Sequence, residues 1–286
     1  MHLDAWGGTD VGRVRERNED AFGLFPEIGL FAVADGLGGH AAGDVASWAA
    51  IREIEREFAA GDAPYHPSRV PAPLATRLLA RARQAVGALA RSAKRSIPEA
   101  GGVVCPEVQD LKRRLEGVVS RANAAVFALS RSREEGSARG MATTVAALAF
   151  TPTWSHCAWV HVGDSRIYRC RTGQLSLLTA DHTLFGEPYR GGGTPPLDLP
   201  HSNGLLRVLG QDPSVQPDLG GDQIVAGDVF LLCSDGISGL LDAHTILGVL
   251  EGAEYAREAG QRLIADSLEA GGRDNATLVV VRVLGT

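Results

Sequence analysis

The chain has 286 residues, of which 44% are hydrophobic and 22% charged, and its formal net charge is -6. This is the composition of a globular protein long enough to bury a full core, and the acidic balance argues against a nucleic-acid-binding protein. No apolar stretch approaches the roughly 20 residues of a membrane span, and the four cysteines lack CxxC spacing, so we expect a protein of the reducing cytoplasm that binds no membrane.

The pattern of apolar residues along the chain predicts strands, then long helices, then strands again. Over the first forty residues, short apolar segments separated by glycine and acidic residues predict strands. Helical spacing follows from Asp44 to Phe58, over 74–94 and over 108–129, and a proline-rich loop separates the first two. Further strands are predicted for MATTVAALAF, HCAWVHV, SRIYRC, QLSLL, DVFLLC and ATLVVVRV, with one helical stretch at about 243–269 before the last of them.

The order of these elements predicts the fold class. Strands and helices are segregated along the chain, which favours an α+β fold over a doubly wound α/β sheet. Short turns such as GD and TG between strands indicate antiparallel pairing. We therefore expect a single domain over residues 1–286, a β-sandwich with helices packed on its outside.

Four aspartates lie at the ends of strands that are predicted to be buried. Asp35, Asp164 and Asp235 follow apolar segments, and Asp274 comes just before one. Each alone is typical of a turn, since Asp-Gly is a favoured hairpin dipeptide. Together they are costly to desolvate unless they are paired or bind a metal. Oxygen ligands without a set of histidines or cysteines indicate a hard cation, Mg²⁺ or Mn²⁺, and paired ions of this kind are used to attack phosphoryl groups.

Seven segments resemble, in the same order, the motifs of metal-dependent protein phosphatases of the 2C type, bacterial branch. They are RERNEDAFG, VADGLGGHAAGDVAS, GMATTVAAL, VHVGDSRIYRC, LTADHT, LLCSDGISGLL and GGRDNATLVVV. The resemblance covers residues 9–283. It implies a four-layer α-β-β-α sandwich of two antiparallel sheets flanked by helices, two central metal ions, and hydrolysis of phosphoserine and phosphothreonine in proteins.

The resemblance also implies which residues bind the metal ions, Mn²⁺ or Mg²⁺. They are Asp20, Asp35, Gly36, Asp164, Asp235 and Asp274. Asp35 would bridge the two central ions with the Gly36 carbonyl beside it, and Asp20 would be an inner ligand or lie just behind one. Asp164 would share a weaker third ion with Asp235.

Two further residues match catalytic positions of the family. Arg15 matches the phosphate-binding arginine, with Arg13 and Arg17 as alternatives two residues away on either side. His40 matches the proposed general acid, and its alternative is a histidine of a turn without chemistry. Arg15, His40 and Asp35 are thus the predicted catalytic residues.

The chemistry of these groups agrees with the resemblance. A water that bridges two metal ions has a lowered pKa and is a hydroxide nucleophile near neutral pH. A planar guanidinium can bind two phosphate oxygens, and a proton donor helps a seryl alkoxide to leave. No cysteine lies in the setting of a cysteine phosphatase.

The chain departs from the family pattern in two places. The segment from about 61 to 107 is longer than expected and is predicted to insert an arginine-rich helix over 74–94. The loop from Phe185 to Gly204 contains GGG and PP, so a helix is excluded across it and we expect an open or mobile loop that affects protein substrates more than small ones.

Three other functions are alternatives to a protein phosphatase. A catalytically weak or inactive binding module would have lost metal-binding aspartates, yet all five are present. The second alternative is a regulator phosphatase of the stress response, and the third is a small-molecule phosphatase. Comparing activity on phosphopeptides with activity on sugar phosphates would distinguish the third from a protein phosphatase. The expected partners are phosphorylated proteins and a bacterial Ser/Thr kinase that the enzyme opposes, and PEIGLFAVADGLGGH also resembles members that act in type VI secretion control.

Overall fold

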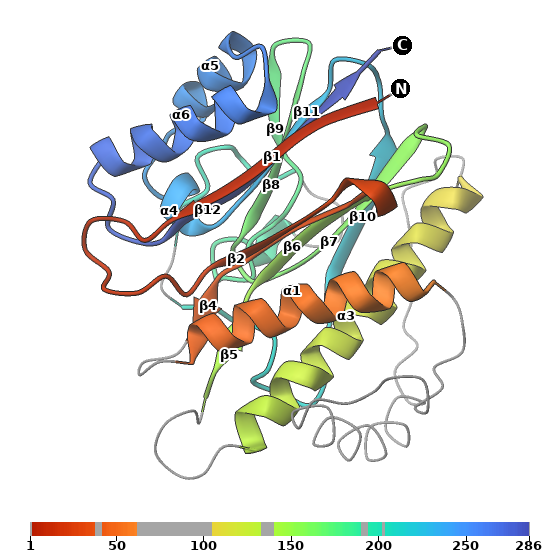
Figure 1. Ribbon diagram of the computed structural model, residues 1–286, viewed down its shortest axis with the longest axis vertical. Helices are drawn as coiled ribbons and strands as arrows, with labels where there is room; N and C mark the ends of the chain where they lie inside the picture. The colour runs from red at the N-terminus through yellow and green to blue at the C-terminus, as the bar shows by residue number, and fades with distance from the viewer. Residues whose placement is uncertain are drawn as a thin grey trace.

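Two antiparallel β-sheets pack face to face, and helices cover the outer face of each sheet (Figure 1). The structure, a computed structural model, describes residues 2–37, 42–61, 105–132, 140–189, 194–201 and 204–285. The four layers confirm the predicted α+β sandwich.

The first sheet has the strand order β1-β12-β11-β8-β9, and all neighbours run antiparallel. Its strands are β1 (His2–Asp10), β8 (Arg166–Arg171), β9 (Gln174–Leu177), β11 (Val229–Cys233) and β12 (Ala276–Leu284). The register pairs His2 with Leu284, so the first and last strands lie side by side and both chain ends lie at one edge of the sheet (Figure 1).

The second sheet has the strand order β10-β7-β6-β3-β2, again antiparallel throughout. Its strands are β2 (Ala21–Phe25), β3 (Leu30–Ala34), β6 (Val145–Phe150), β7 (His156–Val162) and β10 (Asp218–Gln223). Two short strands, β4 (Gly36–Leu37) and β5 (Ala142–Thr143), pair with each other, so that Gly36 lies opposite Thr143.

Two pairs of helices form the outer layers. The helices α1 (Gly43–Ala60) and α3 (Pro106–Ser132) pack on the second sheet, and α5 (Ala243–Gly252) and α6 (Ala256–Glu269) pack on the first. A single turn, α4 (Asp235–Ser238), follows β11 directly, and two short 3-10 helices, η1 (Pro26–Ile28) and η2 (Glu187–Tyr189), lie in loops.

The sandwich has three apolar cores, one between the sheets and one beneath each pair of helices. In β12, Val279 and Val281 face the other sheet, whereas Leu278 and Val280 face α5 and α6. Successive side chains of a strand point to opposite faces. A central strand covered on both sides is therefore apolar throughout, which is why ATLVVVRV and VFLLC were recognisable as strands.

Two elements differ from the sequence prediction. The strand β10 was missed because DLGGDQ has no apolar run; a Cβ on Gly220 would lie 2.2 Å from the Trp159 ring, so glycine there admits a large neighbour from β7. The helical stretch at 243–269 is two helices. The Asp4 side chain of β1 accepts the backbone N–H of Ala256 at 2.6 Å, which starts α6 as a separate helix after Gly252 ends α5.

Some predictions lie outside the described residues. The insertion helix over 74–94 falls within 62–104, and His40 falls within 38–41, and neither range is described. The single-domain organisation stays a prediction. In the described part of the chain, the structure contains no helix long and apolar enough to cross a membrane.

Candidate metal centre

The predicted metal-binding aspartates come from four separate segments that meet at one edge of the sandwich. The loop between β1 and β2, the short strand β4 and the turn α4 lie along the same edge in Figure 1. Asp20 precedes β2, Asp35 lies between β3 and β4, Asp235 begins α4, and Asp274 precedes β12. Asp35 lies near enough to Asp20, Asp235, Asp164 and Asp274 for their charges to raise its pKa, as expected if the sandwich brings these carboxylates together.

The backbone of Asp35 is held from the neighbouring strands. Its N–H donates to the hydroxyl of Thr144 at 2.9 Å, and its carbonyl accepts from the Thr144 N–H at 2.9 Å and from the Thr143 hydroxyl at 2.8 Å. The Thr144 hydroxyl is also 2.7 Å from that of Ser165, beside Asp164. Sequence analysis had placed the two threonines in a core strand; their buried hydroxyls also fix the Asp35 main chain.

Gly36 lies where two other backbone segments approach closely. A Cβ at this position would be 2.2 Å from the Gly43 carbonyl oxygen and 2.3 Å from that of Glu19, and no rotamer change would relieve a clash with backbone. The Gly36 N–H donates to the Glu19 carbonyl at 3.1 Å. Glycine is therefore required by packing; the role of its carbonyl as a metal ligand stays a prediction.

Asn275 attaches the loop that carries Arg15 to the start of β12. Its side-chain amide donates to the carbonyls of Val11 and Arg17 at 2.9 Å each, and its oxygen accepts from the Glu19 N–H at 2.8 Å. This loop places an Arg15 Nη2 atom 2.7 Å from Oδ2 of Asp274. The structure therefore brings Arg15 to the carboxylate group, whereas the side chains of Arg13 and Arg17 form no ion pair with a carboxylate among the described residues.

The aspartates repel one another, and burial acts on three of them, Asp20, Asp35 and Asp235. Burial, and then the charges of neighbouring aspartates, raise the pKa of Asp35 well above its usual value. Burial also raises the pKa of Asp20 to about 7, although hydrogen bonds from Thr277 and Ser234 oppose the rise, and it raises the pKa of Asp235. A group of buried carboxylates that disfavours its own ionisation is stabilised by bound cations.

The donor set fits a divalent cation. Within the described part of the chain, Oδ1 of Asp235 is buried and has no hydrogen-bond partner. Buried carboxylate oxygens normally have partners, and a metal ion provides one where no donor does. Carboxylate oxygens are ligands that Mg²⁺ and Mn²⁺ accept, so the site suits the predicted cofactor.

Asp164 lies beside this group, at the turn after β7. It is 5% exposed, and burial followed by the charge of Asp235 raises its pKa to about 8. Gly163 before it has φ +109°, and a Cβ there would lie 2.5 Å from a Thr144 methyl group, so only glycine fits. One ligand atom each from Asp164, Asp235 and His201 lies within 4.8 Å of the others.

His201 was missed by the sequence analysis because it lies in the proline- and glycine-rich loop, far from any motif. Burial, and then the positive charge of Arg166, lower its pKa to about 4, although the backbone of Ser238 opposes this shift. The ring is therefore neutral at pH 7, which is the form that can bind a metal.

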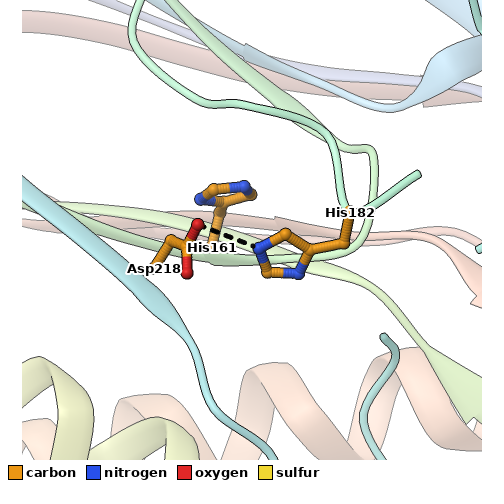
Figure 2. A group of neighbouring side chains, drawn as sticks. All are labelled: His161, His182 and Asp218. Carbon is orange, nitrogen blue, oxygen red and sulfur yellow. Dashed lines mark ion pairs between the residues drawn. The ribbon is translucent and has the colours of Figure 1, made fainter. Parts of the chain in front are cut away.

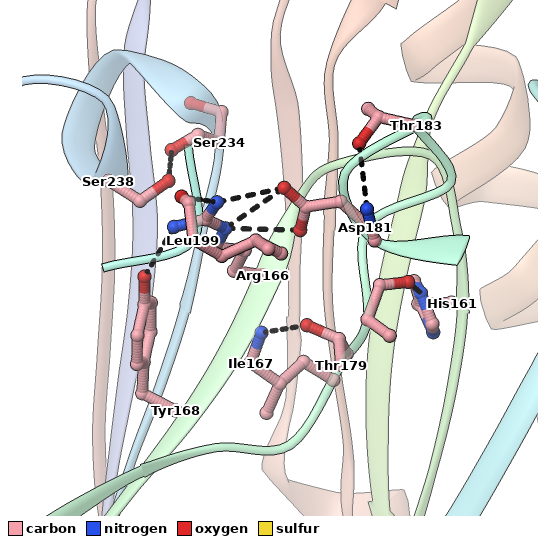
Figure 3. A network of polar contacts seen from close by, with 12 residues as sticks. His161, Arg166, Ile167, Tyr168, Thr179, Asp181, Thr183, Leu199, Ser234 and Ser238 are labelled. Atoms are coloured by element: carbon pink, nitrogen blue, oxygen red, sulfur yellow. Dashed lines mark hydrogen bonds and ion pairs between the residues drawn. The ribbon is translucent and has the colours of Figure 1, made fainter. Parts of the chain in front are cut away.

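A buried ion pair anchors the turn that carries Asp164 (Figure 3). Arg166 donates to Asp181 from Nε at 3.1 Å and from Nη2 at 2.8 Å, and both side chains are almost fully buried. The same guanidinium donates to the hydroxyl of Tyr168 at 3.1 Å and to the carbonyl of Leu199 at 2.7 Å. Arg166 is therefore a structural residue of this turn.

A second cluster, shown in Figure 2, has the composition of a metal site and consists of His161, His182 and Asp218. One ring nitrogen of each histidine is already used in a hydrogen bond with the backbone. The Gly163 N–H donates to Nδ1 of His182 at 3.2 Å, so a neutral ring carries its proton on Nε2, which points to Asp218 at 3.4 Å. His161 uses Nε2 to donate to the Ala180 carbonyl at 2.8 Å. Both histidines thus support the backbone around Asp164.

Comparisons with known proteins agree with this geometry. A family model described as protein phosphatase 2C matches residues 8–270. The serine/threonine protein phosphatase PstP of Mycobacterium tuberculosis is 33% identical over 279 residues, 96% of this chain, and the chain spans 44% of that relative's length.

Solved structures are similar over the whole chain. The catalytic domain of PstP in complex with two manganese ions superposes with a TM-score of 0.71 at 31% identity, covering 99% of both chains. PppA of Pseudomonas aeruginosa, described as a key regulatory component of its type VI secretion system, has a TM-score of 0.64 at 27% identity, covering 99% of this chain and 98% of that one.

Proposed function

The chain belongs to the protein phosphatase 2C family, and we propose that it hydrolyses phosphoserine and phosphothreonine in proteins with the help of bound divalent metal ions. The observation that carries the proposal is the meeting of four carboxylates, those of Asp20, Asp35, Asp235 and the partly exposed Asp274, with Arg15 at one edge of the sandwich. Asp20, Asp35, Asp235, Asp274 and the Gly36 carbonyl would hold a central pair of Mn²⁺ or Mg²⁺ ions. Such ions, when bound, lower the pKa of water and neutralise charge on phosphate oxygens.

Arg15 is the residue that would bind the phosphate group. Its side chain is 53% exposed, and Asp274 accepts a hydrogen bond from one Nη atom. A guanidinium has five N–H donors, so others are left to bind phosphate oxygens in a fixed planar geometry. Asp274 would thereby orient the arginine toward the metal site. Protonation of the leaving serine oxygen by His40 stays a prediction.

We expect Arg15→Ala to raise KM for a phosphothreonine peptide about tenfold or more and to lower kcat by a smaller factor. A phosphate contact of equal strength in the ground and transition states affects binding alone. Steady-state kinetics at saturating Mn²⁺ would measure both constants. Arg13→Ala and Arg17→Ala are the matched controls, and a larger rise of KM in either of them than in Arg15→Ala would show that another arginine binds the phosphate.

The substrate class can be tested by comparing small and peptide substrates. The protein should show a kcat/KM for a phosphothreonine peptide at least about tenfold above that for glucose 6-phosphate, since a peptide can gain binding energy from contacts around the site that a sugar phosphate does not reach. The two should be assayed with the same enzyme and metal. A preference for the sugar phosphate would identify a small-molecule phosphatase on the same fold.

We also propose that the protein opposes a bacterial Ser/Thr kinase in the cytoplasm, because phosphoserine and phosphothreonine are the products of such kinases. The similarity to PppA makes control of type VI secretion the first pathway to examine. Proteins phosphorylated by a kinase of the same cell are the substrates to use first. Resistance of all of them to the purified protein would contradict this assignment.

A further inference from the structure

Three ligand atoms beside the central carboxylates have no hydrogen-bond partner among the described residues. They are Oδ1 of Asp235 and both ring nitrogens of His201, and all three are buried. A buried polar atom without a partner costs roughly 1–3 kcal/mol. One atom each from Asp164, Asp235 and His201 lies within 4.8 Å of the other two. A single species bound between these three residues would satisfy Oδ1 of Asp235 and one ring nitrogen of His201, leaving the other nitrogen to the carbonyl of Ser238, whose backbone raises the pKa of the ring.

The position of His201 is fixed by contacts on both sides of the loop. Leu199, two residues earlier, is 4% exposed, and its carbonyl accepts a hydrogen bond from Arg166 at 2.7 Å (Figure 3). The His201 ring lies against α4, where a Cβ on Gly239 would be 3.7 Å from Cδ2. Because Arg166 follows Asp164 by two residues, one guanidinium ties the histidine loop to the turn that carries the carboxylate.

The charges around the group favour a cation. The positive charge of Arg166 lowers the pKa of His201. Asp181, however, accepts hydrogen bonds from two nitrogens of Arg166 and neutralises its charge. The carboxylates of Asp164 and Asp235 raise each other's energy, since the charge of Asp235 disfavours ionisation of Asp164. A divalent cation between them removes this repulsion, whereas a water molecule does not.

We propose that His201 is a nitrogen ligand of a cation held by Asp164 and Asp235, and that this mixed oxygen and nitrogen set selects Mn²⁺ over Mg²⁺. The family resemblance implied the two aspartates for a weaker third ion, and the structure adds the imidazole of His201 beside them. Mg²⁺ prefers oxygen ligands, whereas first-row transition ions also accept imidazole. The inference rests on the proposed function, since Asp235 also serves the central pair.

Pulsed electron paramagnetic resonance of the tag-free protein loaded with excess Mn²⁺ tests this directly. The wild type should show a nitrogen coupling to bound Mn²⁺, and His201→Gln should lack it. The exposed His244 provides the matched control, because His244→Gln should keep the coupling. Thermal unfolding of each variant establishes that it is folded. Retention of the coupling in His201→Gln, or its absence from the wild type, would overturn the proposal.

A titration gives a second measurement that does not depend on activity. His201→Gln should weaken the weakest Mn²⁺ site at least about tenfold, since losing even an outer partner of a ligand costs about 10- to 100-fold. Its Mg²⁺ affinity at that site should change less. Equal losses for both ions would contradict selection by nitrogen.

The two measurements separate this inference from the proposed function. Peptide hydrolysis without any nitrogen coupling would remove His201 from the site and leave the phosphatase assignment intact. A coupling that depends on His201, in a protein that hydrolyses no phosphopeptide with any metal, would support the ligand and refute the phosphatase.

Discussion

Replacing Asp35 by asparagine is expected to lower kcat for a phosphothreonine peptide by at least about a thousandfold at saturating Mn²⁺. The substitution keeps the shape of the side chain and removes the charge that would bridge the central ions. It thereby removes both the activated water and the charge stabilisation that metal ions supply, and losing one stabilising group alone costs about 10²–10³ in kcat.

The same substitution should leave the fold intact. Asp35 lies near four other carboxylates whose charges disfavour its ionisation, so a neutral side chain relieves repulsion in the metal-free protein. The thermal midpoint of the metal-free variant should therefore not fall below that of the wild type. Asp212→Asn, at an exposed position, is the control for both measurements. A kcat near that of the wild type would refute the role of Asp35.

Replacing Arg166 by methionine is expected to reduce the free energy of unfolding by about 3–5 kcal/mol. The change leaves Asp181 buried without its partner, and an uncompensated buried charge is the reason for a loss of this size. It also leaves the Leu199 carbonyl without its donor. Chemical denaturation of the purified variant would measure the loss.

The double variant Arg166→Met with Asp181→Leu separates the charge from the packing. Replacing both partners by apolar residues of similar size is often close to neutral, so the double variant should recover most of the stability lost by the single one. Arg113→Met provides a surface control, because its pair with Asp110 is exposed and should contribute less than about 1 kcal/mol. A double variant as unstable as the single would contradict a role based on charge.

Much of the sandwich could be predicted because its central strands are covered on both faces. β3 and β11 are unbroken apolar runs and β12 contains one, and each ends or begins within two residues of an aspartate of the site. The aspartates could therefore be recognised as a group from their positions alone. The strand β10 could not, because its glycines make room for side chains of β7 and α3 and carry no pattern of their own.

The residues that position the site were not predictable in the same way. Thr144 and Asn275 act through hydrogen bonds to residues more than a hundred positions away, and nothing local distinguishes them from core or turn residues. His201 lies in a loop whose glycines and prolines suggested only an open chain. Its contact with the metal group depends on Leu199 and Arg166, which meet only in the folded protein.

The most direct test of the account is the dependence of peptide hydrolysis on metal. Protein freed of metal by EDTA and then dialysed should release no phosphate from a phosphothreonine peptide, and added Mn²⁺ or Mg²⁺ should restore the activity. The carboxylates of Asp20, Asp35, Asp235 and Asp274 would hold the metal ions that activate water in this account. Restoration by Mn²⁺ in the wild type but not in Asp35→Asn is the predicted result, and full activity in the metal-free wild type would contradict it.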